Sequence, residues 1–429
     1  MSKLNLIPIG TLFDLEKGSL QSSKCTEGEY TFITAAQEWK THNEYSHECE
    51  ALIFAAAASG SLGRTHYIND KFITSDLCFI LTPKDSKKYP INLKFYHFVF
   101  NSLKDEIVKN TKSGTSKESI NQSNLRNYEI PYFEIDKQNL WIDKLVNTKS
   151  IKEDLELELS TGQSLLKQLK QTILQEAIEG KFTAKYRAKN PDIATAKELL
   201  EQIKTEKEKL VKDNKIKASK PLVPINEDEI PFDIPPSWEW CRLGDIANGF
   251  QYGTSTKSKI NGRVPVLRMG NIQNGRVLLE ELVYTDNESE IEKYSIEYND
   301  LLFNRTNSRE LVGKTAIYSF QEKAIYAGYL IKYSMILSNS HYINYVMNSP
   351  FHYQWCAKVR SDAIGQSNIN ATKLQSYIVP LPPLEEQKEI VATIEKLFTL
   401  CNELESEINQ NKTTVDNLMA TVLKEAFEN

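Results

Sequence analysis

A run of polar side chains follows an apolar segment in the second half of the chain. The apolar segment is Leu301-Leu302-Phe303, and the polar side chains after it are Asn304, Arg305, Thr306, Asn307, Ser308, Arg309 and, a little later, Lys314. Arginine, lysine, asparagine and serine make directional hydrogen bonds to base edges, and lysine, arginine and hydroxyl groups bind phosphates. The composition favours a nucleic-acid contact, although a solvated turn would use the same residue types.

The first half of the chain carries polar residues at the corresponding places. Ser59, Ser61 and Arg64, with His66, stand where the polar run stands in the second half. A further loop in each half is rich in hydroxyl, amide and basic groups, and these loops contain Lys112, Ser113, Thr115, Ser116 and Lys117, and Arg360, Ser361, Gln366 and Asn368. The candidate contacts also include Asn121, Gln122 and Asn370. Either loop could equally be a flexible connector.

The motifs that suggest an enzyme are incomplete. Gly313-Lys314-Thr315 resembles the end of a phosphate loop, but Ser308 stands where such a loop needs its first glycine. Asn348-Ser349-Pro350-Phe351 resembles an amino-methyltransferase tetrapeptide, but its second residue is serine and no glycine-rich cofactor loop precedes it. Ser349-Pro350 is more typical of a helix start. We therefore expect no catalytic residue and no cofactor.

Composition describes a globular protein of more than one domain. The chain has 429 residues, 40% hydrophobic and 25% charged, which is too long for one ordinary core. Its net charge of −5 means that any surface for nucleic acid must be locally basic. No signal pattern and no membrane-length apolar run occurs.

Cysteine usage favours a reducing compartment. The six cysteines are scattered, at Cys25, Cys49, Cys78, Cys241, Cys356 and Cys401. This spacing indicates reduced thiols and a cytoplasmic location. His42, His47 and Cys49 come nearest to a metal-ligand cluster, but without a second ligand pair they are better interpreted as loop residues, so we expect no metal.

One long segment of the chain occurs twice. Ile120-Asn121 recurs as Ile369-Asn370, and Glu176-Ala177 recurs as Glu425-Ala426, so the offset is 249 residues at both ends (369 − 120 and 426 − 177). Leu52-Ile53-Phe54 matches Leu301-Leu302-Phe303 at the same offset, and Leu62 to Thr65 matches Val312 to Thr315 after a one-residue gap. These matches predict that a whole unit was duplicated.

The repeated segment includes a helix with a heptad seam in each copy. In the first copy the seam consists of Leu155, Leu159, Gly162, Leu166, Leu169 and Ile173. In the second copy it consists of Leu404, Ile408, Asn411, Val415, Leu418 and Val422. The alternating steps of four and three residues favour one antiparallel pair made from both copies. Two amphipathic helices packed on separate domains would be the simpler alternative.

The remaining pattern is mixed. Apolar runs at 7–15, 30–33, 51–55 and 72–81 predict strands, and residues 93–110 have helical spacing. Asn190-Pro191 predicts a helix start, 194–210 a charged helix, and the prolines of 219–236 an extended linker. This mixture indicates an α+β fold.

The motifs of the second half resemble a known family. The runs 301–308 with 311–316, 366–374 and 379–387 resemble those of type I restriction-modification specificity (S) subunits, and 198–235 and 238–246 are similar too. The resemblance therefore covers residues from about 150 to 429. The first half keeps Gly63, Asn121-Gln122 and Pro131, but it has Ala55-Ala56 where the second has Asn304-Arg305.

This resemblance implies two similar target recognition domains, separated by an antiparallel pair of long helices with pseudo-twofold repetition. We assign 1–142 and 238–383 to the recognition domains, 143–218 and 384–429 to the helical spacers, and 219–237 to a linker. Each domain would read one half of a bipartite, asymmetric site in double-stranded DNA. The helices would dock two methyltransferase (M) subunits and, through them, motor-nuclease (R) subunits, while the S subunit would carry no chemistry.

A second hypothesis is a protein scaffold, whose duplicated helices and heads would bind only proteins. Salt dependence separates the two hypotheses, because binding through several phosphates weakens steeply as salt rises. The DNA hypothesis further predicts that helix length sets the gap between half-sites, since a helix of about 35 residues is roughly 50 Å long.

Overall fold

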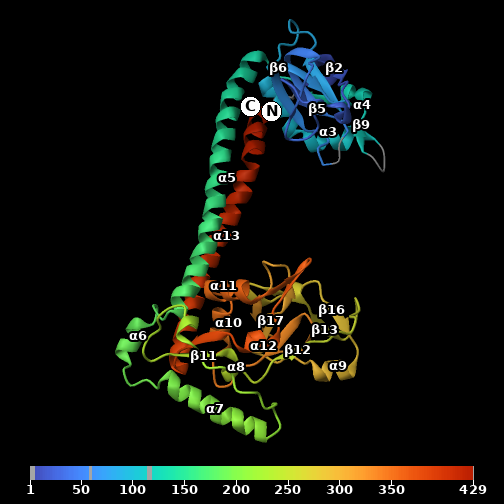
Figure 1. Ribbon diagram of the computed structural model, residues 1–429. Coiled ribbons are helices and arrows are strands. Elements are labelled where there is room, and N and C mark those ends of the chain that lie inside the picture. Colours follow the sequence, from blue (N-terminus) through green and yellow to red (C-terminus); the bar gives the residue numbers. More distant parts are fainter. Residues whose placement is uncertain (1–4, 58–59, 114–117, 429) are drawn as a thin grey trace. The chain divides into compact units, whose positions relative to one another are not determined.

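The computed structural model describes residues 5–57, 60–113 and 118–428, with side chains as far as residue 425. The chain forms two compact units, unit 1 from residues 1–162 and 407–429, and unit 2 from residues 163–406. The long helices α5 (Ile135–Ile178) and α13 (Leu384–Glu428) contribute to both units (Figure 1).

Unit 1 is built around a six-stranded mixed sheet in the order β2-β7-β5-β6-β3-β4. Its strands are β2 (Phe13–Lys17), β3 (Tyr30–Ile33), β4 (Lys40–His42), β5 (His47–Ala55), β6 (Thr65–Thr74) and β7 (Cys78–Pro83). Alternate residues of β5 point into hydrophobic clusters on opposite faces of the sheet. Leu52 and Phe54 share a cluster with residues of helix α2 (Leu93–Ser102), whereas Ile53 belongs to the cluster on the other face. Both faces of the central strand are therefore buried.

Smaller elements complete unit 1. They are β1 (Leu6–Pro8), α1 (Ile9–Leu12), the 3-10 turn η1 (Ser22–Lys24), α3 (Lys104–Thr111), β8 (Lys112–Ser113), β9 (Ser119–Ile120), α4 (Gln122–Asn127) and β10 (Glu129–Pro131). The strands predicted at 30–33 and 51–55 are confirmed as β3 and the end of β5.

Three sequence predictions for unit 1 are wrong in detail. Residues 7–15 are not one strand, because they are interrupted by the short helix α1. The helical turn places the side chains of both Ile9 and Leu12 in the core, whereas an extended chain would point them to opposite faces. Residues 72–81 are not one strand, because a tight turn, in which the Cys78 N–H donates to the Ser75 carbonyl, separates β6 from β7, and the two strands lie on opposite sides of β5. The helix predicted at 93–110 is interrupted at Leu103, which has φ −87° and ψ 5°.

Unit 2 repeats the sheet of unit 1 in the order β12-β21-β17-β19-β15-β14. The strands are β12 (Gln251–Tyr252), β14 (Ile272–Gln273), β15 (Gly275–Val277), β17 (Leu301–Asn304), β19 (Thr315–Ile317) and β21 (Leu330–Tyr333). The sense of pairing also agrees at every step, since β15 and β19 are parallel, as are β3 and β6, and the other neighbours are antiparallel. The residues directly after Lys314 form β19, not the helix that a phosphate loop would lead into.

Unit 2 also has elements outside this sheet. They are α6 (Ala184–Lys189), α7 (Ala196–Lys212), η2 (Glu227–Glu229), β11 (Glu239–Arg242), α8 (Leu243–Ile246), β13 (Val264–Leu267), η3 (Met269–Asn271), β16 (Val283–Thr285), α9 (Glu288–Lys293), β18 (Thr306–Asn307), β20 (Ile325–Tyr326), α10 (Ser340–Val346), α11 (Pro350–Val359), β22 (Ser361–Ala363), β23 (Gln366–Asn368), α12 (Ala371–Gln375) and β24 (Ile378–Leu381). The predicted helix start at Ser349-Pro350 is confirmed, because Ser349 caps α11.

The helix start predicted at Asn190-Pro191 is wrong. Asn190 ends α6, and α7 begins after Thr195. The Thr195 hydroxyl accepts from the Glu198 N–H while the Glu198 carboxylate accepts from the Thr195 N–H. This capping box satisfies two backbone donors at once and sets the start of the helix.

The duplication is visible in the register of a small strand pair in each unit. Ile7 pairs with Ile130 in unit 1, and Cys241 pairs with Val379 in unit 2, which agrees with the alignment of the two halves. A buried glutamine follows the strand pair in each unit, Gln138 in unit 1 and Gln387 in unit 2. The two glutamines are separated by the same offset of 249 residues (387 − 138). Gln138 Oε1 accepts from the N–H of Asn92 at 2.7 Å, and Gln387 Oε1 accepts from that of Asn339 at 2.8 Å.

Helices α5 and α13 lie side by side and antiparallel within each unit (Figure 1). In unit 1, a methyl group at Gly162 would lie 3.6 Å from Ile408 Cδ1. In unit 2, Lys170 Nζ is 2.7 Å from Glu405 Oε2. The predicted antiparallel pairing of the two copies is therefore confirmed, and α5 begins at Ile135, earlier than the expected start near residue 143, because Trp141 and Leu145 pack into the core of unit 1.

The expected seam is only partly buried. Leu166, Ile173 and Val415 are buried, and Leu155, Leu159, Ile408, Leu418 and Val422 are half-buried, whereas Leu169 and Leu404 are exposed. Leu174, Cys401 and Leu423 are buried although they lie outside the predicted seam. An α-helix of 3.6 residues per turn drifts away from a strict heptad, so the buried stripe moves along the surface.

Candidate nucleic-acid interface

The polar residues of unit 2 are brought together by a three-stranded sheet in the order β18-β23-β22. Thr306 pairs with Asn368, and Asn307 pairs with Ser367. Asn368 Nδ2 donates to Thr306 Oγ1 at 2.7 Å, so one candidate side chain orients another. Asn307 is half-buried and Gln366 is exposed. The sheet thus joins two sequence runs that are far apart in the chain.

Asp362 on β22 links two of the predicted arginines. Its carboxylate lies 3.1 Å from Arg309 Nη2 and 3.1 Å from Arg360 Nε, and it accepts a hydrogen bond from Ser367 Oγ at 2.6 Å. The hydrogen bond from Ser367, together with the charges of Arg309 and Arg360, lowers the pKa of Asp362. Two cations against one anion leave this cluster with a net positive charge.

Arg305 is held over an aromatic ring. Its guanidinium carbon lies 4.7 Å from the centre of the Tyr252 ring, and its Nη1 donates to the Gly328 carbonyl at 3.3 Å. Stacking on a ring fixes the plane of a guanidinium, which is what a bidentate contact to a base or phosphate requires. Tyr252 and the neighbouring Tyr329 are both exposed.

Asn304 and Lys314 lie differently from what a contact residue needs. Asn304 is fully buried at the end of β17, so its side chain does not reach solvent. Lys314 Nζ donates to Gln273 Oε1 at 2.8 Å, and burial lowers the pKa of this amine. The polar run is therefore not a simple solvated turn, since it begins in the core and emerges at Arg305.

In unit 1 the described candidates also have protein partners. Arg64 Nη1 donates to the Ala35 carbonyl and to Ser61 Oγ, at 3.3 and 3.2 Å. Lys112 forms an ion pair with Glu118 at 2.7 Å, and Ser113 Oγ donates to the Ser119 carbonyl. The predicted contacts Ser59, Thr115 and Lys117 lie outside the described residues.

Three of the candidates hold the backbone of their own unit. Asn121 and Asn370 cap α4 and α12, accepting from the N–H groups of Asn124 and Lys373. Gln122 Nε2 donates to the Leu15 carbonyl at 2.6 Å. The motif positions that recur at the 249-residue offset therefore contribute to the frame of each unit.

The sequence did not point to Tyr252, Asp362 or Ile364. Ile364 is the tip of the β22-β23 hairpin and is fully exposed. An apolar residue followed by glycine between two polar runs was the available signal for this hairpin. No local pattern reveals Tyr252, because its partner Arg305 is distant in the sequence.

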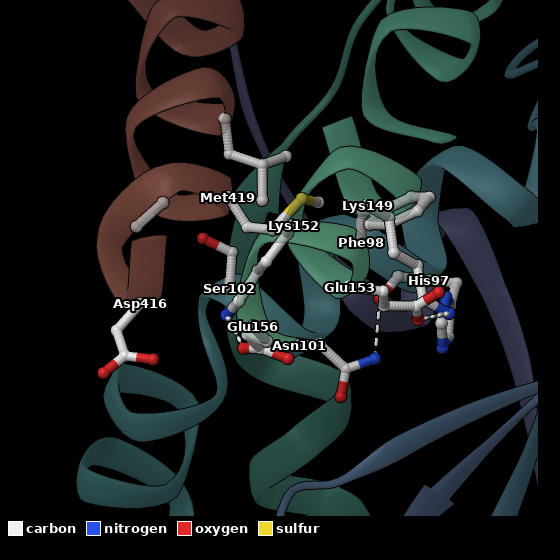
Figure 2. Close-up of a pocket in the computed structure, with 12 residues that line it drawn as sticks. His97, Phe98, Asn101, Ser102, Lys149, Lys152, Glu153, Glu156, Asp416 and Met419 are labelled. Carbon is white, nitrogen blue, oxygen red and sulfur yellow. Dashed lines mark hydrogen bonds and ion pairs between the residues drawn. The ribbon is translucent and has the colours of Figure 1, made fainter. Parts of the chain in front are cut away.

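A separate cavity of about 510 Å³ lies in unit 1, between α2, α5 and α13. Figure 2 shows the lining, which includes His97, Asn101, Lys152, Glu156 and Met419. Lys152 and Glu156 pair at 3.5 Å. Burial, with a smaller effect of Lys149, lowers the pKa of His97 to about 4, so this imidazole is neutral near pH 7. The described candidate contacts lie elsewhere.

Within the described residues, no three His, Cys, Asp or Glu side chains gather as a metal site would require. His42 bonds to the backbone of Thr26, and His47 pairs with Glu16, so each has a protein partner.

In the part of the chain that the structure covers, no helix is both long and apolar enough to cross a membrane.

Comparison with known proteins gives consistent results. The family model described as the type I restriction modification DNA specificity domain matches residues 1–160 and 235–411. The chain is 33% identical to the type I restriction enzyme EcoAI specificity subunit of Escherichia coli over 268 aligned residues. This alignment covers 60% of this chain and 44% of that subunit. It is 22% identical to the EcoDI specificity subunit of Escherichia coli, over 98% of this chain and 87% of that subunit.

Two solved structures share the fold. A chain from a structure of a type I R-M system, described for its complex assembly and conformational transition, matches with a TM-score of 0.70 and 15% identity over 100% of this chain and 99% of that one. The HsdS subunit from Thermoanaerobacter tengcongensis matches with a TM-score of 0.53 and 15% identity, over 100% of this chain and 97% of that one. The alignment with the EcoAI subunit, in contrast, spans less than half of that protein.

Proposed function

Because this chain belongs to the type I restriction modification DNA specificity family, we propose that it is the non-catalytic specificity subunit of a type I restriction-modification complex. Each unit reads one half of a bipartite, asymmetric site in double-stranded DNA. The chain works in the cytoplasm, and its six cysteines are free thiols.

The main support is that the two units share a backbone frame but differ in the side chains at its polar edge. The Ile120 N–H donates to the Ala56 carbonyl at 2.8 Å, and the Ile369 N–H donates to that of Arg305 at 2.9 Å. The same backbone hydrogen bond is therefore made to Ala56 in unit 1 and to Arg305, which lies over the Tyr252 ring, in unit 2. Two such edges would recognise different bases, which an asymmetric site requires.

The proposed DNA-contacting set is smaller than the sequence suggested. In unit 2 it consists of Arg305, Asn307, Arg309, Arg360, Gln366 and Asn368. In unit 1 it consists of Ser61, Arg64, Lys112 and Ser113, together with the undescribed Ser59, Thr115 and Lys117. Asn304 and Thr306 are left out because they are buried, and Lys314 because it donates to Gln273. Asn121, Gln122 and Asn370 are left out because they hold backbone groups.

We further propose that α5 and α13 dock two M subunits, which bring the R subunits. Exposed apolar side chains on these helices, including Leu157, Leu165, Leu169, Leu400 and Leu404, supply surface for such docking. Apolar residues exposed along a paired helix are typical of a protein interface.

The deciding experiment is the methylome of a host that carries this chain with its M subunit. A two-part motif with a fixed gap, methylated on adenine in each part, is the expected result. Modification at random or none at all would refute the proposal. The control is the same host with the gene for this chain deleted.

Salt dependence tests the protein-scaffold hypothesis, which explains the repeated helices but not the basic, amide-rich edge. If the complex binds DNA through six or more phosphates, its affinity falls by roughly a thousandfold between 50 and 200 mM salt. A scaffold that binds only proteins would show no such DNA binding at low salt.

Helix length is proposed to set the gap between the half-sites. α5 has 44 residues, which corresponds to about 66 Å of helix. Removing one heptad from α5 and the facing heptad from α13 is expected to change the gap in the methylated motif and to leave the two half-sites unchanged. An unchanged gap would contradict this proposal.

A further inference from the structure

Ile364 is the most exposed large hydrophobic side chain among the described residues, with a relative exposure of 105%. It forms the two-residue turn of the β22-β23 hairpin with Gly365, between the paired residues Ala363 and Gln366. Gly365 has φ +79°, the left-handed conformation that such a turn needs at its second residue. The isoleucine therefore projects at the end of a two-stranded ribbon.

Folding alone does not account for isoleucine at this position. Turns favour Gly, Asn, Asp, Ser and Pro, because these residues tolerate turn geometry or bond to the nearby backbone. A β-branched aliphatic side chain does neither, and at this tip it buries no surface. A local choice that conflicts with the fold around it is expected at a functional position.

The base of the ribbon is firmly held. Asp362 bonds to Ser367 across the hairpin and to Arg309 and Arg360 outside it. Lys373 Nζ donates to Ser361 Oγ at 2.8 Å. These contacts fix the direction of the hairpin, so that little conformational entropy is lost when its tip binds.

The surroundings of the tip are polar and cationic. Gln366 follows it, and Arg309 and Arg360 lie at its base. A protein interface needs an apolar core with several large side chains, which one isoleucine among charged groups does not provide. Cations at the base of a ribbon, which can hold phosphates, together with one aliphatic group at its tip, are suited instead to a DNA groove.

We propose that Ile364 is a specificity-determining residue that recognises thymine, through its C5-methyl group, in the half-site bound by unit 2. The major groove admits a two-stranded β-ribbon, and thymine is the base that presents an apolar methyl group there. The proposal rests on the proposed function, since it assumes that unit 2 reads DNA. It adds one residue and one base to that function.

The test uses the complex of this chain with its M subunits and duplexes that carry the site found in the methylome. Each thymine of the two half-sites is replaced singly by deoxyuridine, which removes only the methyl group. A half-site that is methylated on adenine contains at least one thymine, on the opposite strand. The wild-type complex is expected to lose about fourfold in affinity at one position of one half-site, as expected for one buried methyl group.

The Ile364→Ala complex is expected to bind the thymine and deoxyuridine duplexes equally at that position. Ile364→Val should keep part of the difference, and Val223→Ala, which also trims an exposed aliphatic side chain of unit 2, should keep all of it. Circular dichroism and co-purification with the M subunits verify that each variant folds and assembles.

Three results would overturn the inference. In the first, the wild-type complex binds its site specifically but no deoxyuridine weakens it, so the function stands and the role of Ile364 falls. In the second, Ile364→Ala either loses the M subunits, so the tip contacts protein, or keeps them together with the full wild-type deoxyuridine difference, so another residue contacts the methyl group. In the third, the wild-type complex shows no site-specific binding, so the proposed function itself fails.

Discussion

Glu386→Ala is expected to destabilise the junction of α6, β11 and α13 in unit 2. The Glu386 carboxylate has no solvent exposure. It accepts hydrogen bonds from Thr183 Oγ1 and Arg187 Nη1, each at 2.6 Å, and from Trp238 Nε1 at 2.9 Å. One side chain therefore connects the segment after α5, helix α6 and the residue that precedes β11 to α13.

The magnitude follows from what the substitution leaves behind. Removing one partner of a buried ion pair costs roughly 3–5 kcal/mol. The Trp238 N–H and the Thr183 hydroxyl also lose their acceptor, at about 1–3 kcal/mol each where water does not replace it. Arg187 remains partly exposed and can be solvated, which limits the total. We expect about 4 kcal/mol for Glu386→Ala, and about half of that for Glu386→Gln, which retains one acceptor oxygen.

Hydrogen exchange measured by mass spectrometry is the suitable assay, because a chain of two units does not unfold as one two-state system. A loss of 4 kcal/mol accelerates exchange in residues 180–190 by about a thousandfold if these amides exchange through opening of the junction. The matched control is Glu385→Ala, because Glu385 is exposed and pairs only with Lys388 in the described contacts. Its expected cost is below about 0.5 kcal/mol.

Equal protection of residues 180–190 in Glu386→Ala and Glu385→Ala would refute this expectation. A double-mutant cycle refines the test, since Arg187→Ala leaves the Glu386 charge buried and unpaired. The double variant Arg187→Ala/Glu386→Ala is therefore expected to cost less than the sum of the two single variants.

Other predictions concern each unit separately. Gln138→Ala and Gln387→Ala, which remove the same bond from the two units, should each cost about 2–3 kcal/mol, with exchange accelerated near Asn92 or Asn339 alone; acceleration in the other unit would contradict this expectation. Burial lowers the pKa of His352 from its ordinary value of 6.5 to about 4, so the unfolded chain takes up the proton first as pH falls. This histidine should therefore remove about 2 kcal/mol of stability from unit 2 between pH 7 and pH 5, measured by exchange protection, and a flat profile there would refute it. Asp362→Ala should release Arg309 and Arg360, raise affinity for non-specific DNA and steepen its salt dependence by about one phosphate; unchanged salt dependence would show that these arginines do not face the phosphates.

The sequence alone determined the repeat and most of what depends on it. A constant offset of 249 residues implied two similar units, and the register of Ile7 with Ile130 and of Cys241 with Val379 agrees with it. The heptad steps predicted an antiparallel helix pair, which the approach of Ile408 to Gly162 and the ion pair of Lys170 with Glu405 confirm. These features were accessible because hydrophobic periodicity and local motifs survive duplication.

Only the tertiary structure decided which polar residues face solvent. Asn304 belongs to a polar run in the sequence, yet it is buried at the end of β17, while Arg305 beside it lies over Tyr252. In the sequence Arg309 and Arg360 look like free cations, but in the structure both pair with Asp362. The physical reason is that exposure and charge pairing depend on neighbours brought together by the sheet, and in most of these cases the partners lie tens of residues apart in the chain.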